Sequence, residues 1–135
     1  MGDRCAVYFN VKESDHQAFL AALNRATDYG HDVDPDEVCE DSIHFYEVNC
    51  GWYTEIEQMV KDQECPPFIC HQEEGSGYGA MVHVFVGGEY ENCVCDHDGC
   101  PVARIAPEGI ADDDVAVAEN YWRLLRIFND YLQEI

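Results

Sequence analysis

The stretch GAMVHVFVGGEYENCVCDHDGCPVARI, residues 79–105, predicts its own structure more clearly than any other part of the chain. Residues 81–86 are mostly β-branched or aromatic, Gly87-Gly88 is typical of a two-residue turn, and residues 89–95 are again strand-like. Asp98-Gly99 is a second turn signal, and the residues after it can form a third strand. We therefore predict a three-stranded antiparallel meander in the C-terminal part of the chain.

The second turn of this meander carries residues that can bind zinc. If Asp98-Gly99 is a two-residue turn, His97 lies opposite Cys100, and Cys95 shares their side of the hairpin because side chains alternate along a strand. Thiolate and imidazole are the usual zinc ligands, and the segment CPPFICH can supply the fourth from Cys70, or from Cys65 or His71. Zinc is therefore possible here; the alternative is that the cysteines are core thiols and His97 is an exposed turn residue.

Alternating and helical patterns predict the other elements. The expected strands cover residues 4–11, 43–50 and 68–71. Capping boxes at Ser14 and Thr54 predict two short helices, and residues 112–134 predict one long C-terminal helix. The acidic segment 31–42 is expected to be a loop. This order predicts one α+β domain over residues 1–135, with helices covering one face of a mostly antiparallel sheet.

The C-terminal helix has an apolar stripe at heptad spacing. Tyr121, Leu125, Phe128 and Leu132 follow one another at steps of four and three residues, as in a coiled-coil seam. Such a stripe can pack over the sheet of its own chain, or it can pair with a second copy. Packing over the sheet is the preferred interpretation, and a homodimer through this helix is the alternative.

The charge balance limits the partners that the chain can have. It has 28 acidic residues against 7 Lys plus Arg, a formal net charge of −21 at pH 7. Between Arg25 and Lys61 there are ten acidic residues and no Lys or Arg. A protein surface that binds nucleic acid or an anionic membrane needs clustered basic residues, so we expect neither as a direct partner. No long apolar run follows the N-terminus, so a cytoplasmic location is expected.

No motif in the chain indicates an enzyme. There is no nucleophile elbow, no P-loop and no dinucleotide-binding fingerprint. A reactive thiol would need nearby cationic groups to lower its pKa, and Lys and Arg are scarce. We therefore expect a non-enzymatic protein without a cofactor, zinc excepted.

Acidic runs occur throughout the chain, including DVDPDEVCED, EIEQMVKDQE, QEE, EYENCVCDHD and ADDD. In size and composition the chain resembles the small acidic inhibitors of phages and plasmids, the anti-CRISPR and antirestriction proteins. The resemblance implies a DNA-mimic inhibitor whose partner is a basic nucleic-acid-binding complex in the cytoplasm of the host cell. The carboxylates that would then contact the partner are Asp32, Asp34, Asp36, Glu37, Glu40 and Asp41, followed by Glu73 and Glu74. Two alternatives remain open: a zinc-stabilised structural or adaptor domain, and an ordinary acidic domain of a salt-adapted organism.

Overall fold

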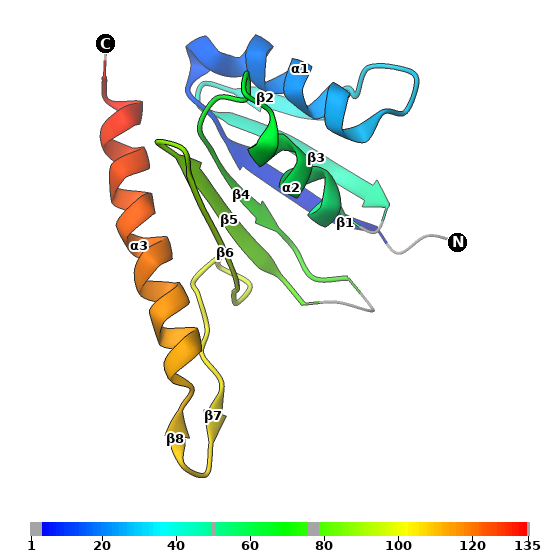
Figure 1. Ribbon diagram of the computed structural model, residues 1–135. Helices are drawn as coiled ribbons and strands as arrows, with labels where there is room; N and C mark the ends of the chain where they lie inside the picture. Colours follow the sequence, from blue (N-terminus) through cyan, green and yellow to red (C-terminus); the bar gives the residue numbers. More distant parts are fainter. Residues whose placement is uncertain (1–3, 50, 76–78, 135) are drawn as a thin grey trace.

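The computed structural model describes residues 4–49, 51–75 and 79–134 and has a six-stranded antiparallel sheet at its centre (Figure 1). The strands are β1 (Arg4–Asn10), β2 (Glu37–Cys39), β3 (Ser42–Asn49), β4 (Phe68–Gln72), β5 (Met81–Val86) and β6 (Glu89–Val94). Their order across the sheet is β2-β3-β1-β4-β5-β6. This confirms the predicted α+β fold with a mostly antiparallel sheet.

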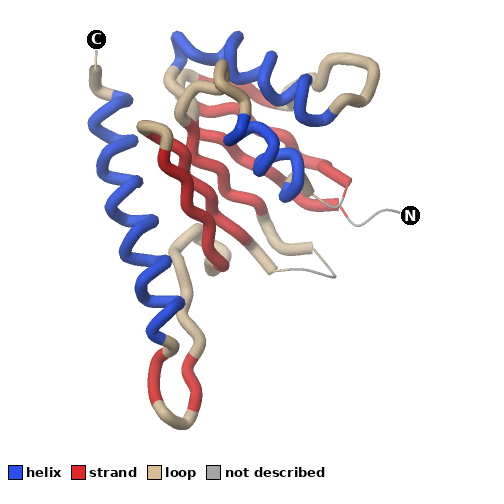
Figure 2. The backbone as a smooth tube through the Cα atoms, in the orientation of Figure 1, coloured by secondary structure: helices blue, strands red, loops and turns tan. Residues whose placement is uncertain are grey.

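Helices cover both faces of this sheet (Figure 2). On one face lie α1 (His16–Thr27), which follows a short 3-10 turn η1 (Glu13–Asp15), and α2 (Tyr53–Lys61). On the other face lies the long helix α3 (Asp112–Leu132). The prediction that the helices cover a single face is therefore wrong. The reason is that β4 and β5 carry apolar side chains on both of their faces.

The core between the sheet and α1 and α2 is aromatic. Phe9 of β1 packs against Phe19 of α1 with ring centroids 4.7 Å apart, and Phe68 of β4 lies 5.7 Å from Phe19. Phe45 of β3 and Trp52 meet edge to face at 4.8 Å. Aromatic pairs at these distances combine large buried areas with a preferred geometry, so this layer positions β3 and the start of α2 relative to each other.

The second core lies under α3. Tyr121, Leu124 and Phe128 are buried against Val82, Val84 and Val86 of β5, so the helix packs over the sheet of its own chain as preferred. Of the four residues predicted for a dimer, only Leu125 and Leu132 keep part of their surface exposed. A homodimer through this helix stays a prediction.

The C-terminal end of α3 is tied to the N-terminal part of the chain. The Tyr131 hydroxyl donates a hydrogen bond to the carboxylate of Asp15. The Lys12 ammonium donates to the backbone carbonyl of Glu134 at 2.6 Å and lies over the Tyr131 ring. These contacts join the end of α3 to the segment between β1 and α1.

Several local predictions are wrong. The acidic segment predicted as a loop contains the three-residue edge strand β2. Neither predicted capping box forms: α1 is capped at Asp15 and α2 at Trp52, both without a side-chain hydrogen bond. Residues 101–105 do not form a third meander strand: Pro101 makes an isolated bridge with Cys95, and Ile105 pairs with Ile110 instead.

The turn after β6 has three residues instead of two. The Asp96 N–H donates to the Cys100 carbonyl, and the Asp96 carboxylate accepts hydrogen bonds from the N–H groups of Asp98 and Cys100, each at 2.9 Å. Cys100 therefore pairs with Asp96 and not with His97. The chain then forms a small separate hairpin, β7 (Ile105–Ala106) and β8 (Gly109–Ile110), which projects beyond the sheet in Figure 1.

His83 of β5 is an ionisable group in the core. It is fully buried, its Nδ1 shares a hydrogen bond with the Tyr90 hydroxyl at 2.7 Å, and its ring stacks on the Tyr90 ring. Within the described part of the chain its Nε2 has no hydrogen-bond partner. Burial lowers the pKa of His83 from 6.5 to about 4, so the imidazole is neutral in the folded protein at pH 7.

A substitution under α3 tests whether this helix belongs to the core. We expect Phe128→Ala to lower the free energy of unfolding by about 3–5 kcal/mol, because it leaves a cavity between the helix and β5. Ile127→Ala is the matched control, since Ile127 is 40% exposed and should cost less than about 1 kcal/mol. Urea unfolding measures both values. Similar small losses in the two variants would contradict the packing of α3.

The buried histidine predicts a stability that depends on pH. Because its pKa is lower in the folded than in the unfolded chain, the unfolded chain binds the proton first, and stability falls as the pH drops from about 6.5 towards 4. The loss approaches about 3 kcal/mol at the acid end. Urea unfolding of the native protein and of His83→Gln at several pH values measures this contribution as the difference between the two curves. If the free energies of unfolding of the native protein and of His83→Gln changed with pH by the same amount, this contribution of His83 would be contradicted.

Candidate functional site

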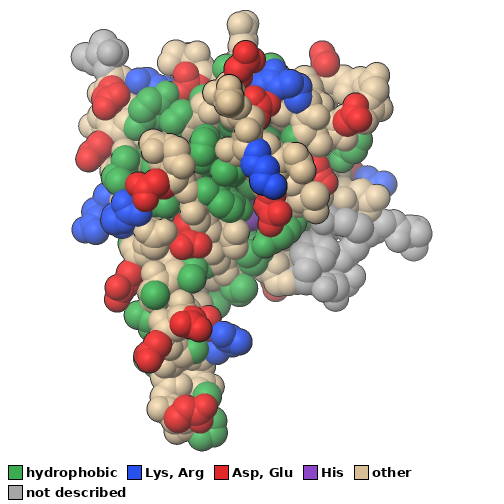
Figure 3. All heavy atoms as spheres, viewed as in Figure 1, with side chains coloured by type: hydrophobic (Ala, Val, Ile, Leu, Met, Phe, Trp, Pro, Cys, Tyr) green, Lys and Arg blue, Asp and Glu red, His purple; other side chains and the backbone are tan. Residues whose placement is uncertain are grey.

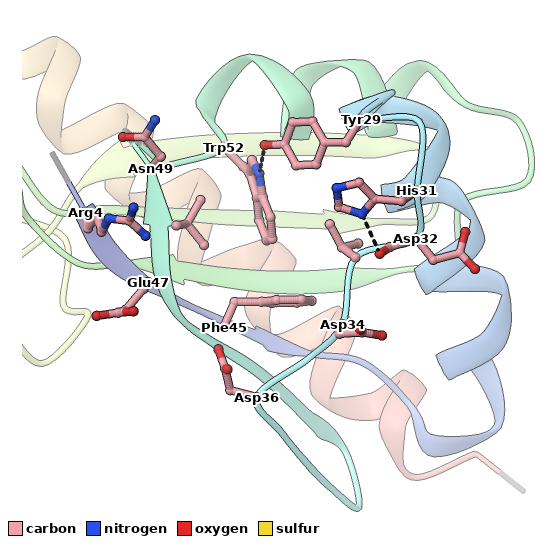
Figure 4. A pocket seen from close by; sticks show the side chains of 12 residues that line it. Arg4, Tyr29, His31, Asp32, Asp34, Asp36, Phe45, Glu47, Asn49 and Trp52 are labelled. Atoms are coloured by element: carbon pink, nitrogen blue, oxygen red, sulfur yellow. Dashed lines mark hydrogen bonds between the residues drawn. The ribbon is translucent and has the colours of Figure 1, made fainter. Parts of the chain in front are cut away.

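A cleft of about 620 Å³ lies at one end of the α1 and α2 layer (Figure 4). Its walls come from the loop after α1, the C-terminal half of β3, the start of β1 and the residue before α2. This volume is within the range of small-ligand sites. The lining residues are Arg4, Tyr29, His31, Asp32, Val33, Asp34, Asp36, Phe45, Glu47, Val48, Asn49 and Trp52.

The loop that forms one wall is folded back onto α1. The helix ends in left-handed backbone at Asp28, with φ of 49°, and Gly30 has φ of 80°, so the chain reverses direction within three residues. The Asn24 side-chain carbonyl accepts a hydrogen bond from the Val33 N–H at 2.8 Å. The loop is therefore held against the helix, and its acidic residues are brought to the edge of the cleft.

Trp52 and Phe45 form the floor of the cleft. Trp52 is 3% exposed; its backbone N–H donates to the Gln72 Oε1 and its indole N–H donates to the Tyr29 hydroxyl, each at 2.9 Å. Gly51, with φ of 70°, lies directly over the Gln72 side chain. Tyr29 is therefore fixed by Trp52 while half of its surface stays exposed to the cleft and to solvent.

The rim of the cleft is acidic. Asp32, Asp34, Asp36 and Glu47 contribute four carboxylates against the single guanidinium of Arg4, a net charge of −3 for these five groups. The Asp36 carboxylate also accepts a hydrogen bond from the Tyr46 backbone N–H at 2.8 Å. In Figure 4 the Asp32 side chain points away from Trp52 and Phe45. Asp32 therefore adds negative charge near the cleft without pointing into its interior.

Other predicted partner-binding carboxylates lie on the opposite face of the sheet. Glu73 accepts a hydrogen bond from the Tyr8 hydroxyl at 2.7 Å, and Glu37 accepts one from the Tyr46 hydroxyl. The hydrogen bond to Glu73, followed by burial, raises the pKa of Tyr8 to about 12. Both carboxylates therefore belong to a cluster of aromatic side chains on the α3 side of β1 and β3.

The last three predicted carboxylates are separate from both groups. Glu40 and Asp41 form the turn between β2 and β3, where the Asp41 carboxylate accepts the Glu13 N–H at 3.0 Å. Glu74 is exposed after β4. The structure thus brings together three of the eight predicted residues, Asp32, Asp34 and Asp36, at one cleft.

The predicted zinc ligands are divided between core and surface. Cys70 and Cys95 are buried, and burial raises the pKa of Cys70 well above its usual value and that of Cys95 to about 11. His97 and Cys100 are exposed at the turn. Among the residues placed by the structure, no group of three or more His, Cys, Asp or Glu side chains is arranged to hold a metal ion. Zinc binding stays a prediction.

The aromatic part of the cleft was not predicted from the sequence. Tyr29, Phe45 and Trp52 come from a loop, a strand and a helix start. Phe45 has the alternating pattern of a core strand, and nothing in its local sequence distinguishes it from the other core residues. Glu47 and Arg4 were likewise missed as lining residues, because only the pairing of β1 with β3 places them at the same end of the sheet.

No protein-family model, curated protein or solved structure matches this chain. None of the helices within the described ranges is long and apolar enough to cross a membrane.

The glycine before Trp52 tests how the cleft floor is held. Gly30 is the matched control, because Gly30 and Gly51 both have positive φ but a Cβ at Gly30 meets nothing within 4 Å. We expect Gly30→Ala to lower the free energy of unfolding by about 1–2 kcal/mol through backbone strain alone. Gly51→Ala should cost about 1–3 kcal/mol more, because its Cβ would lie 2.6 Å from the Gln72 side chain. Urea unfolding of the two variants measures the difference. Equal losses would show that Gln72 moves aside freely.

Proposed function

We propose that this chain is a non-enzymatic inhibitory binding protein that occupies a basic nucleic-acid-binding surface of a host defence complex. The observation that carries the proposal is that Asp34, Asp36 and Glu47 line one cleft with an aromatic floor. A concave acidic site of this kind suits a cationic group that projects from a partner. It does not suit phosphate, which the carboxylates repel.

The basic residues of the chain do little to offset its acidity. Within the described residues, three of the seven form ion pairs with neighbouring carboxylates: Arg25 with Asp62, Arg104 with Asp114 and Arg123 with Glu89, at 2.7 to 2.8 Å. Most of the 28 acidic side chains have no basic partner within the chain, since only seven Lys and Arg exist. In Figure 3 acidic side chains are spread over every part of the visible face.

Such a surface can compete with nucleic acid for a basic groove. Duplex DNA carries about one negative charge per 1.7 Å of its axis, and proteins that bind it present matching Lys and Arg. A folded acidic protein is attracted to the same groove by the same long-range field, which accelerates association at low salt. The cleft adds a specific contact to this general attraction, so binding would depend on its residues and not only on the net charge.

Charge reversal in the cleft tests the proposal. The immobilised protein, Asp34→Lys/Glu47→Lys and the control Glu108→Lys/Asp130→Lys are each incubated with bacterial lysate and washed at rising salt. We expect the native protein and the control to retain the same nucleic-acid-binding complex, because both controls are exposed residues outside the cleft. The cleft variant should retain several-fold less, and added DNA or RNA should displace the complex from the native protein.

Two results would contradict the proposal. The first is retention of only nonspecific basic proteins, in equal amounts by all three forms. The second is a retained complex that added nucleic acid does not displace. Circular dichroism of each variant, measured in the same low-salt buffer, confirms that the fold is intact and also detects the unfolding at low salt that a salt-adapted protein would show.

A further inference from the structure

We infer that the cleft binds the side chain of an arginine residue of the partner protein. This inference rests on the proposed function, which makes the partner a basic protein. It concerns which cationic group is recognised. The carboxylates alone would attract any cation; the cavity and its aromatic rings favour one that is flat and partly apolar.

The aromatic residues offer a surface on which a planar cation can stack. Tyr29 is 50% exposed, and its hydroxyl is fixed by the Trp52 indole, so the ring keeps its orientation without a ligand. The His31 ring lies 6.0 Å from it at an interplanar angle of 38°, and Phe45 and Trp52 close the inner end of the cleft. A guanidinium group is attracted to such ring faces and is more weakly hydrated than an ammonium group.

Carboxylates border the cleft on two sides. Asp34 lies on the loop wall and Glu47 on the strand wall, and in Figure 4 their carboxylates point outward on opposite sides of Phe45. Among the residues that the structure describes, none donates a hydrogen bond to the Asp34 carboxylate or forms an ion pair with Glu47. Guanidinium has five N–H donors in one plane and can bind carboxylates in pairs.

The size and charge of the cleft agree with a single arginine. About 620 Å³ accommodates the whole side chain, including its apolar stem against Trp52 and Phe45. Arg4 contributes one positive charge at the strand end of the cleft, which leaves the net charge of −3. One bound arginine would change this net charge to −2.

Short peptides test this recognition directly. The indole N–H signal of Trp52 reports on the cleft by heteronuclear NMR, and the variant Trp122→Phe removes the other indole signal. The probes are acetyl-Gly-Arg-Gly-amide, its neutral citrulline counterpart of the same shape, and the lysine peptide. We expect the arginine peptide to shift the Trp52 signal in a saturable way, the lysine peptide to bind more weakly, and the citrulline peptide to cause no saturable shift.

Variants then separate stacking from charge. Tyr29→Ala should weaken arginine binding about two- to fivefold through loss of the cation–aromatic contact, while Tyr46→Ala, which removes a similarly exposed ring outside the cleft, should not. Asp34→Asn/Glu47→Gln should weaken it further than the control Glu108→Gln/Asp130→Asn. Equal binding of arginine and citrulline peptides, or equal effects of cleft and control variants, would overturn the inference.

These outcomes are distinct from those of the capture experiment. A partner retained through the cleft, without any saturable shift by the arginine peptide, would leave the proposed function standing and overturn the arginine inference. Selective binding of the arginine peptide, without a retained nucleic-acid-binding complex, would support the arginine site and contradict the proposed function.

Discussion

The fold depends on the burial of β4 and β5 on both of their faces. Phe68 and Cys70 belong to the core under α1 and α2, while Ile69 between them belongs to the core under α3. A strand that is apolar on both faces needs cover on both sides, and the chain supplies it from elements that are far apart in sequence. The aromatic layer on the first side also holds Trp52 against Phe45, so the same constraint that completes the sheet forms the floor of the cleft.

Local patterns were sufficient for most elements of the fold. The run 81–86, the Gly87-Gly88 turn and the strand after it were predicted closely, because their β propensity and turn chemistry agree. The third strand failed because Pro101 has no N–H to donate to a ladder, and because the Asp96 carboxylate takes up the N–H groups of the turn. The continuous apolar run at Phe68 to Cys70 indicates two-sided burial, but it does not say which helix provides the second cover.

The site was predictable only in part. The acidity of the loop drew attention to Asp34 and Asp36, but Glu37, the next residue, points to the opposite face of the sheet because side chains alternate along β2. The aromatic floor could not be predicted, because Tyr29, Phe45 and Trp52 meet only through tertiary packing. The resulting combination of buried rings and exposed carboxylates is what distinguishes this cleft from the rest of an acidic surface.

The position of α3 at the end of the described chain has a consequence for synthesis on the ribosome. The apolar face formed by Ile69, Val82 and Val84 exists as soon as β4 and β5 pair, yet its cover emerges only with the last residues that the structure describes. Nascent chains with such exposed surfaces are prone to aggregate. The acidic residues that precede α3 give the growing chain a high negative charge, and like charges on neighbouring chains oppose their association.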